Sequence, residues 1–116
     1  MKAKPLMLTA ERKDDIAIFH THGYVDDECG EVIAKRFEEY WSLGIKDFLF
    51  DMSDSKLAST LGVGVLIEII RQINDSVGTM AFCNCNKVIS TTFKIMGLAK
   101  YTKIYRTMEE ALEGMS

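Results

Sequence analysis

The sequence predicts an α/β fold, with a mixed sheet of four to five strands and about four helices packed mainly on one face. Short apolar runs rich in β-forming residues alternate along the chain with stretches whose apolar residues recur at helical spacing. A chain of 116 residues has room for one hydrophobic core but not for a second, and its composition of 47% hydrophobic and 27% charged residues is that of a globular protein. We therefore expect one domain over residues 1–116.

The first part of the chain predicts a β-hairpin followed by a helix. Residues 6–9 and 16–20 are rich in β-forming side chains, and the polar residues 12–15 between them predict the turn. Asp26 or Asp27 can cap the helix that follows, because either carboxylate can accept a hydrogen bond from a backbone N–H group at the helix start.

The remaining elements continue this alternation. A continuous apolar run at residues 48–50 predicts a strand covered on both faces, which we expect to end at Asp51. After it the sequence predicts, in order, a helix from about Gly62, a strand at 80–83, a helix at 88–96, a short edge strand at 104–105 and a last helix capped by Thr107. Strands that alternate with helices in this way predict at least some parallel pairing.

Composition and charge exclude several classes of function. The formal net charge of −3 is too small to predict a nucleic acid or an anionic membrane as the partner. No apolar run approaches the roughly 20 residues of a membrane-spanning helix, and no long apolar segment follows the basic residues 1–5, so we expect neither membrane insertion nor a signal peptide. The three cysteines are an odd number among core-like residues, which favours free thiols in the reducing cytoplasm.

Two hydroxyl side chains, Ser59 and Thr60, precede the helix that is expected near Gly62. Either hydroxyl lies where the helix needs an N-cap and could accept a hydrogen bond from an unpaired backbone N–H group. If Thr60 is that cap, its replacement by alanine should cost about 1 kcal/mol. The same N–H groups and the helix dipole would also stabilise a phosphate, so the position fits either a plain cap or a modification site.

Five short motifs follow one another in an order that resembles a known family. They are Gly23-Tyr24-Val25-Asp26, Asp51-Met52-Ser53, Gly62-Val63-Gly64-Val65-Leu66, Met96-Gly97-Leu98 and Glu109-Glu110-Ala111-Leu112. Their order and spacing are similar to those of the STAS family, whose bacterial members include the anti-sigma-factor antagonists. The resemblance covers nearly the whole chain and implies a STAS-like domain.

The resemblance also implies a switch by phosphorylation. The family's phosphorylated serine falls on Thr60, with Ser59 as the alternative acceptor. Two positions depart from the family's Asp-Ser-Ser-Gly loop, with Ser59 in place of the aspartate and Leu61 in place of the second serine. In the family the unmodified domain docks onto an anti-sigma serine/threonine kinase, which releases a sigma factor, and phosphorylation ends the docking. The implied partner is therefore an anti-sigma factor kinase.

The residues around Thr60 make up the implied partner surface. They are Asp26, Ser59, Gly62, Gly64, Glu68 and Arg71. Gly64, Glu68 and Arg71 fall on the polar side of the predicted helix, and the small Gly64 would let another backbone come close. Asp26 fits the N-cap of the preceding helix at least as well as it fits a partner contact.

Two alternative functions stay open. A STAS domain that serves as a scaffold or a transporter-associated subunit, and is never phosphorylated, fits the departures at Ser59 and Leu61. The residues available to a small Cys/His enzyme or a metal-binding protein are His20, His22, Cys29, Cys83 and Cys85. Their spacing matches no known zinc motif, and the sequence has neither a nucleophile elbow nor a P-loop, so we expect no catalytic residue, metal or cofactor.

The stretch from residue 84 to residue 106 is basic and contains no aspartate or glutamate. Its charged residues are Lys87, Lys94, Lys100, Lys103 and Arg106. This pattern fits a solvated face or, alternatively, a docking surface for an acidic partner. The sequence leaves the oligomeric state open.

Overall fold

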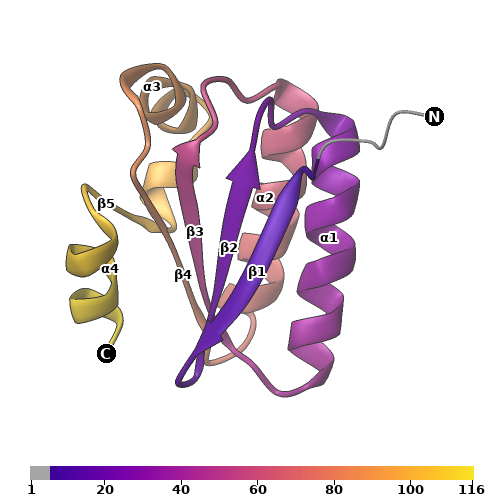
Figure 1. Ribbon diagram of the computed structural model, residues 1–116, viewed down its shortest axis with the longest axis vertical. Helices are drawn as coiled ribbons and strands as arrows, with labels where there is room; N and C mark the ends of the chain where they lie inside the picture. The colour runs from indigo at the N-terminus through magenta and orange to yellow at the C-terminus, as the bar shows by residue number, and fades with distance from the viewer. Residues whose placement is uncertain (1–5) are drawn as a thin grey trace.

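The computed structural model describes residues 6–116, so the basic residues 1–5 lie outside the described part of the chain. Its elements follow the predicted alternation of strands and helices (Figure 1). In chain order they are β1 (Leu8–Lys13), β2 (Ile16–His22), α1 (Asp27–Ser42), β3 (Asp47–Asp54), α2 (Thr60–Asn74), β4 (Thr79–Cys83), α3 (Lys87–Ile95), the 3-10 helix η1 (Leu98–Lys100), β5 (Lys103–Tyr105) and α4 (Met108–Met115).

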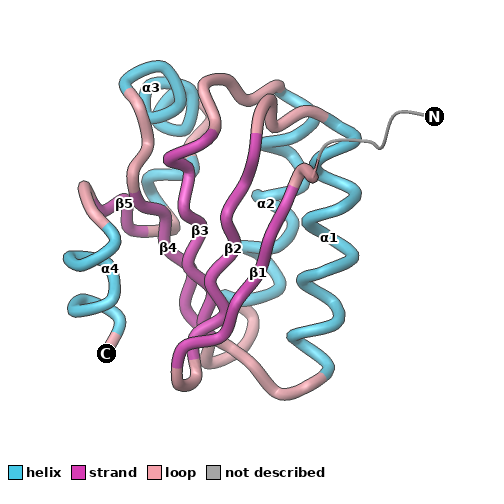
Figure 2. The backbone as a smooth tube through the Cα atoms, in the orientation of Figure 1, coloured by secondary structure: helices cyan, strands magenta, loops and turns pink. Residues whose placement is uncertain are grey.

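The five strands form one mixed sheet in the order β1-β2-β3-β4-β5 (Figure 2). β1 pairs antiparallel with β2, and each of the other neighbouring pairs is parallel. Parallel neighbours need long crossover connections, and helices supply them here. The predicted α/β class with a mixed sheet is confirmed.

The helices cover the two faces of the sheet unequally. On one face, α1, α2 and α3 share a core with aromatic side chains of the central strands, among them Phe19, Phe50 and Phe82. On the other face, α4 covers a smaller apolar cluster around Ile18 and Leu49. The prediction that helices pack mainly on one face is therefore confirmed, and no helix formed by residues 6–116 covers much of the second face near β1 (Figure 1).

Element boundaries differ from the prediction in the hairpin and at the start of α2. β1 begins at Leu8 rather than at Leu6. The hairpin turn contains only residues 14–15, because residues 12–13 still pair with β2. α2 begins at Thr60 rather than near Gly62, because Ser59 provides the cap. The first strand therefore ends later, and α2 begins earlier, than the apolar pattern alone indicates.

β3 is also longer than predicted. It ends at Asp54 rather than at Asp51. Met52 is buried in the core, and Asp54 still pairs with His22 of β2 across a local irregularity in the register. Pairing and burial therefore carry the strand through residues that look like a polar loop in the sequence.

Two predicted helix caps are confirmed. The Asp26 carboxylate accepts a hydrogen bond from the N–H group of Cys29 at the start of α1. The Thr107 hydroxyl accepts one from the N–H group of Glu110 at the start of α4. Among residues 6–116, no helix is both long enough and apolar enough to cross a membrane.

Candidate functional site

The carboxyl ends of the parallel strands β2, β3 and β4 meet at one edge of the sheet, where three loops are hydrogen-bonded to one another. The loops contain residues 23–26, 55–59 and 84–86. The N–H group of Val25 donates to the carbonyl of Leu57 at 3.0 Å, and the N–H group of Ser59 donates to the carbonyl of Val25 at 2.9 Å. The Asn86 side chain donates to the carbonyl of Lys56 at 3.1 Å. Each loop then leads into a helix, so three helix N-termini lie at this edge.

Ser59 and Thr60 have different environments at the start of α2. The Ser59 hydroxyl accepts a hydrogen bond from the N–H group of Gly62 at 3.0 Å, so Ser59 is the N-cap. Thr60 is the first helical residue; its side chain is exposed and makes no hydrogen bond within the described residues 6–116. Of the two candidate caps, Ser59 is therefore the one that the helix uses, and the cost of about 1 kcal/mol for a lost cap belongs to Ser59 rather than to Thr60.

Asp26 and Gly62 bring the first two loops into close contact. Asp26 caps α1 with its carboxylate, which is the alternative role foreseen for it. Gly62 is buried beneath the loop that contains Val25, and a Cβ atom at this position would overlap the carbonyl oxygen of Val25. Gly62 is thus the residue that lets α2 start directly against the loop before α1.

The outward side of α2 carries the remaining predicted contacts. A Cβ atom added to Gly64 would meet no atom within 4 Å, so nothing within the described chain requires a glycine there. Glu68 and Arg71 are exposed and form an ion pair at 3.2 Å. The structure therefore places Gly64, Glu68 and Arg71 on one accessible stripe that begins at Thr60, as their helical spacing predicts.

Three exposed apolar side chains at the same edge were not predicted from the sequence to be contact residues. They are Tyr24, Leu57 and Leu61, which are 54%, 53% and 66% exposed. Tyr24 and Leu57 come from the two hydrogen-bonded loops, and Leu61 follows Thr60 in the first turn of α2. Large apolar residues in otherwise polar loops could have indicated a contact surface, since such side chains gain from burial by a partner.

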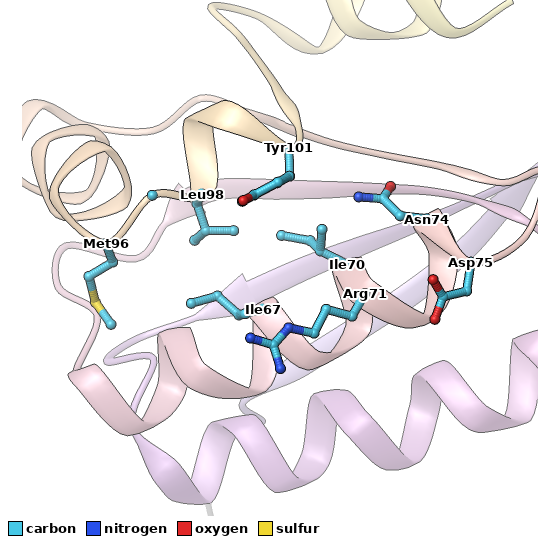
Figure 3. A pocket seen from close by; sticks show the side chains of 9 residues that line it. Ile67, Ile70, Arg71, Asn74, Asp75, Met96, Leu98 and Tyr101 are labelled. Carbon is cyan, nitrogen blue, oxygen red and sulfur yellow. The ribbon is translucent and has the colours of Figure 1, made fainter.

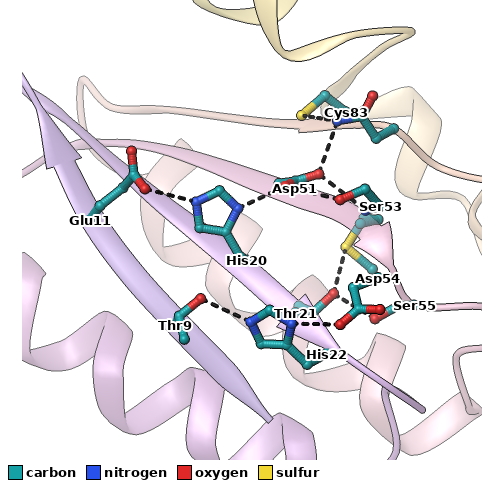
Figure 4. A network of polar contacts seen from close by, with 12 residues as sticks. Thr9, Glu11, His20, Thr21, His22, Asp51, Ser53, Asp54, Ser55 and Cys83 are labelled. Atoms are coloured by element: carbon teal, nitrogen blue, oxygen red, sulfur yellow. Dashed lines mark hydrogen bonds and ion pairs between the residues drawn. The ribbon is translucent and has the colours of Figure 1, made fainter. Parts of the chain in front are cut away.

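A polar network lies on the sheet face opposite α1 and α2 (Figure 4). His20 Nδ1 is 2.7 Å from Asp51 Oδ2, and His20 Nε2 is 3.1 Å from Glu11 Oε2. The nearly buried Asp51 also accepts hydrogen bonds from the Asn84 side chain at 3.0 Å and from the backbone N–H group of Ser53 at 3.1 Å. The network therefore links β1, β2, β3 and the loop after β4.

The charges in this network stabilise one another. Burial alone would lower the pKa of His20, but the hydrogen bonds and negative charges of Asp51 and Glu11 outweigh it and raise that pKa above its ordinary value. For Asp51, burial acts to raise the pKa, but the hydrogen bonds from Asn84 and then His20 lower it below its ordinary value. The arrangement favours a charged imidazolium between two carboxylates.

The histidines and cysteines considered for an enzyme or a metal site do not converge. Cys83 belongs to the apolar cluster beneath α4, whereas Cys85 packs against the core on the other face of the sheet. Burial raises the pKa of Cys29 to about 11 and those of Cys83 and Cys85 to about 12, which disfavours a reactive thiolate. Nowhere in residues 6–116 do three or more His, Cys, Asp or Glu side chains form a group that could hold a metal ion.

Comparisons with known proteins agree with this fold. A model of the STAS domain matches residues 7–111. The chain is 26% identical over 101 residues to a Thermotoga maritima protein that is provisionally named an anti-sigma factor antagonist. The matched residues cover 86% of this chain and 89% of that protein. A crystal structure from Thermotoga maritima with the same provisional description has a TM-score of 0.87 at 24% identity, covering 94% of both chains. The Bacillus protein SpoIIAA in its phosphorylated form has a TM-score of 0.76 at 17% identity, covering 94% of this chain and 99% of that one.

Proposed function

The chain belongs to the STAS domain family, and from this premise we propose that it acts as an anti-sigma factor antagonist. In this proposal, the carboxyl edge of the sheet docks onto an anti-sigma serine/threonine kinase, and phosphorylation of Thr60 ends the docking. Docking releases a sigma factor, so the protein acts in the cytoplasm as a binding partner rather than as an enzyme.

The contrast between Ser59 and Thr60 carries the proposal. The Ser59 hydroxyl is engaged by the N–H group of Gly62, whereas the Thr60 hydroxyl is exposed and makes no hydrogen bond within the described residues. A kinase must reach the acceptor oxygen, and Thr60 can offer its oxygen without loss of the α2 cap. We therefore assign the phosphate to Thr60, with Ser59 as the alternative acceptor.

A phosphate on Thr60 would be tolerated by the fold and would oppose docking. It adds about −1.5 to −2 charge at the N-terminus of α2, where the helix dipole favours negative charge. The partner, however, would cover the exposed Tyr24, Leu57 and Leu61 at the same edge. Exclusion of water from that surface would also desolvate the phosphate, which is unfavourable unless the partner supplies matching positive charge.

Gly64 supports a close approach of the partner to α2. Glycine inside a helix costs roughly 0.5–1 kcal/mol relative to alanine, and no contact within the described chain requires it at this position. A partner backbone that packs against α2 would explain the residue, because a Cβ atom would then lie between the two chains. Glu68 and Arg71, further along the same stripe, would lie at the rim of the interface.

The proposal is tested by purification of the tagged protein from its source cell, followed by mass spectrometry of its partners and of its own peptides. We expect an anti-sigma factor kinase to co-purify and a phosphate to occur on the peptide that contains Thr60. In the same experiment, Thr60→Glu should recover less of the kinase, because its charge imitates the phosphate. Gln72→Glu is its matched control, because it adds the same negative charge at an exposed position near the other end of α2.

Each other outcome has a defined meaning. A phosphate on Ser59 would move the switch by one residue. A bound kinase without any phosphate on either hydroxyl would favour the scaffold alternative, which the departures at Ser59 and Leu61 already suggest. If no anti-sigma factor or kinase co-purifies with the wild type, the proposed function is wrong.

A further inference from the structure

A groove of about 470 Å³ lies between the C-terminal half of α2 and the connection from α3 to β5 (Figure 3). The side chains used below are Ile67, Ile70 and Arg71 of α2, and Met96, Leu98 and Tyr101 of the connection. Arg71 is eleven residues after Thr60, which corresponds to about 16 Å along the helix axis. The groove is therefore separate from the candidate phosphorylation site, although it shares Arg71 with the outward stripe of α2.

The floor of the groove is apolar. Ile70 and Leu98 belong to the hydrophobic core, and the partly buried Ile67 and Met96 pack beside them. Tyr101 stands at the edge and is 65% exposed. Next to Met96, the side chain of Ile95 is 80% exposed. The floor is thus apolar and bordered by an exposed aromatic ring, which favours a protein segment laid across the groove over a small ligand held inside a cavity.

The two sides of the groove differ in charge. On the side of α3 and η1 the chain is basic, with Lys94 and Lys100 exposed and no aspartate or glutamate between residues 84 and 106. On the α2 side, Arg71 is paired with Glu68 at 3.2 Å. Asp75 also lines the groove there, so this side carries carboxylates. Carboxylates on the α2 side disfavour a uniform polyanion such as a nucleic acid, whereas the exposed lysines of α3 and η1, the two elements on the other side, favour acidic side chains.

We propose that this groove binds an acidic amphipathic helix of a partner protein. The apolar stripe of that helix would lie between Ile67 and Leu98, and its acidic flank would face Lys94 and Lys100. Such helices bind apolar grooves through residues spaced at i, i+3, i+4 and i+7, and charged flanks set their orientation. This contact requires neither a kinase nor a phosphate on Thr60, and it therefore goes beyond the proposed function.

Titration of isotope-labelled protein with synthetic peptides, followed by NMR, tests the proposal. The probe is a helical peptide of about four turns with a leucine stripe, glutamate along one flank of that stripe and uncharged polar residues elsewhere; the control peptide has lysine in place of glutamate. We expect chemical-shift changes at the amides of Ile67, Arg71, Gly97 and Tyr101. The acidic peptide should bind at least about ten-fold more tightly than the lysine peptide, and its affinity should fall as salt screens the charges.

Charge-matched variants show whether the predicted rim is responsible. The double change Lys94→Glu and Lys100→Glu should weaken binding at least about five-fold. Lys13→Glu with Lys35→Glu alters the net charge equally at exposed positions on β1 and α1, and it should have little effect. Tyr101→Ala should also weaken binding, because the exposed ring would lose its contact with the peptide.

The proposal is overturned if the shifts lie elsewhere, if the lysine peptide binds equally well, or if both lysine pairs have the same effect. A Thr60→Glu variant separates this proposal from the proposed function. It should weaken kinase docking roughly five- to thirty-fold but leave peptide affinity unchanged, so either proposal can fail without the other.

Discussion

His20 and Asp51 form a 2.7 Å hydrogen bond between β2 and β3, on the face of the sheet that α1 and α2 do not cover. Their side chains meet because the parallel register pairs these two residues directly. Glu11 of β1 engages the other ring nitrogen at 3.1 Å. Since a carboxylate can only accept, both nitrogens donate when the ring is charged, so the charged form makes both hydrogen bonds across the three strands, whereas a neutral ring donates only one.

We predict that His20→Gln lowers the free energy of unfolding relative to the wild type, and that this loss is larger at mildly acidic and neutral pH than at high pH. A raised pKa in the folded state means that the stabilisation is complete below the ordinary value of 6.5 and is lost as the pH rises through the folded-state value. Urea unfolding should show a difference of about 1–2 kcal/mol near pH 5.5 that shrinks toward pH 9. Glu11→Gln should remove part of the same pH dependence. Equal differences at both pH values would contradict the assignment of charge to His20.

Two glycines in the first turns of α2 should respond in opposite ways to alanine. Gly62→Ala should lose about 1–3 kcal/mol of unfolding free energy, because the Cβ atom would overlap the carbonyl of Val25. Gly64→Ala should gain about 0.5–1 kcal/mol, because the Cβ atom meets open space in a helix interior. Thermal or urea unfolding of the two variants measures both effects. Destabilisation by Gly64→Ala would show that the surroundings of this residue are tighter than described.

The cap of α2 gives a third prediction. Ser59→Ala should lose about 1 kcal/mol of stability, because the N–H group of Gly62 loses its acceptor. Thr60→Ala should stay within about 0.5 kcal/mol of the wild type, since its side chain is exposed and caps nothing. The pair is compared by urea unfolding at one pH. The reverse order of the two effects would make Thr60 the cap and remove the contrast on which the phosphorylation site rests.

The order of strands and helices could be predicted from the sequence because the change between apolar runs and helical spacing is a local signal. The end of β3 could not, since its last residues look polar and are held by pairing of Asp54 with His22. The His20–Asp51 bond joins residues 31 apart in the sequence. Buried parallel strands lack the alternation of polar and apolar residues that would fix their register, so this contact needs the fold.

The candidate site could also be predicted only in part, because its local pattern is visible in the sequence whereas its long-range contacts are not. The resemblance of the motifs to a family placed the hydroxyl pair Ser59 and Thr60 at the start of a helix, and this is correct. Which hydroxyl is the cap depends on the backbone angles of one residue, a detail below the precision of helix boundaries taken from a sequence. The role of Gly62 depends on its contact with Val25, which the sequence separates by more than thirty residues.

Replacement of Thr60 itself should separate docking from phosphorylation. Thr60→Ala should fold, bind the kinase recovered from the source cell and accept no phosphate. Thr60→Glu should also fold, because a carboxylate is favourable at the N-terminus of α2. Its charge should nevertheless weaken docking by about 1–2 kcal/mol, roughly a five- to thirty-fold loss in affinity. Gln72→Glu carries the same added charge near the other end of the helix and should bind like the wild type. Calorimetry of each variant with the purified kinase measures the affinities, and labelled ATP measures phosphate transfer.

Two outcomes would contradict this prediction. Label that persists in Thr60→Ala but disappears in Ser59→Ala would assign the switch to Ser59. Equal affinities of Thr60→Ala and Thr60→Glu would show that charge at this position does not control docking.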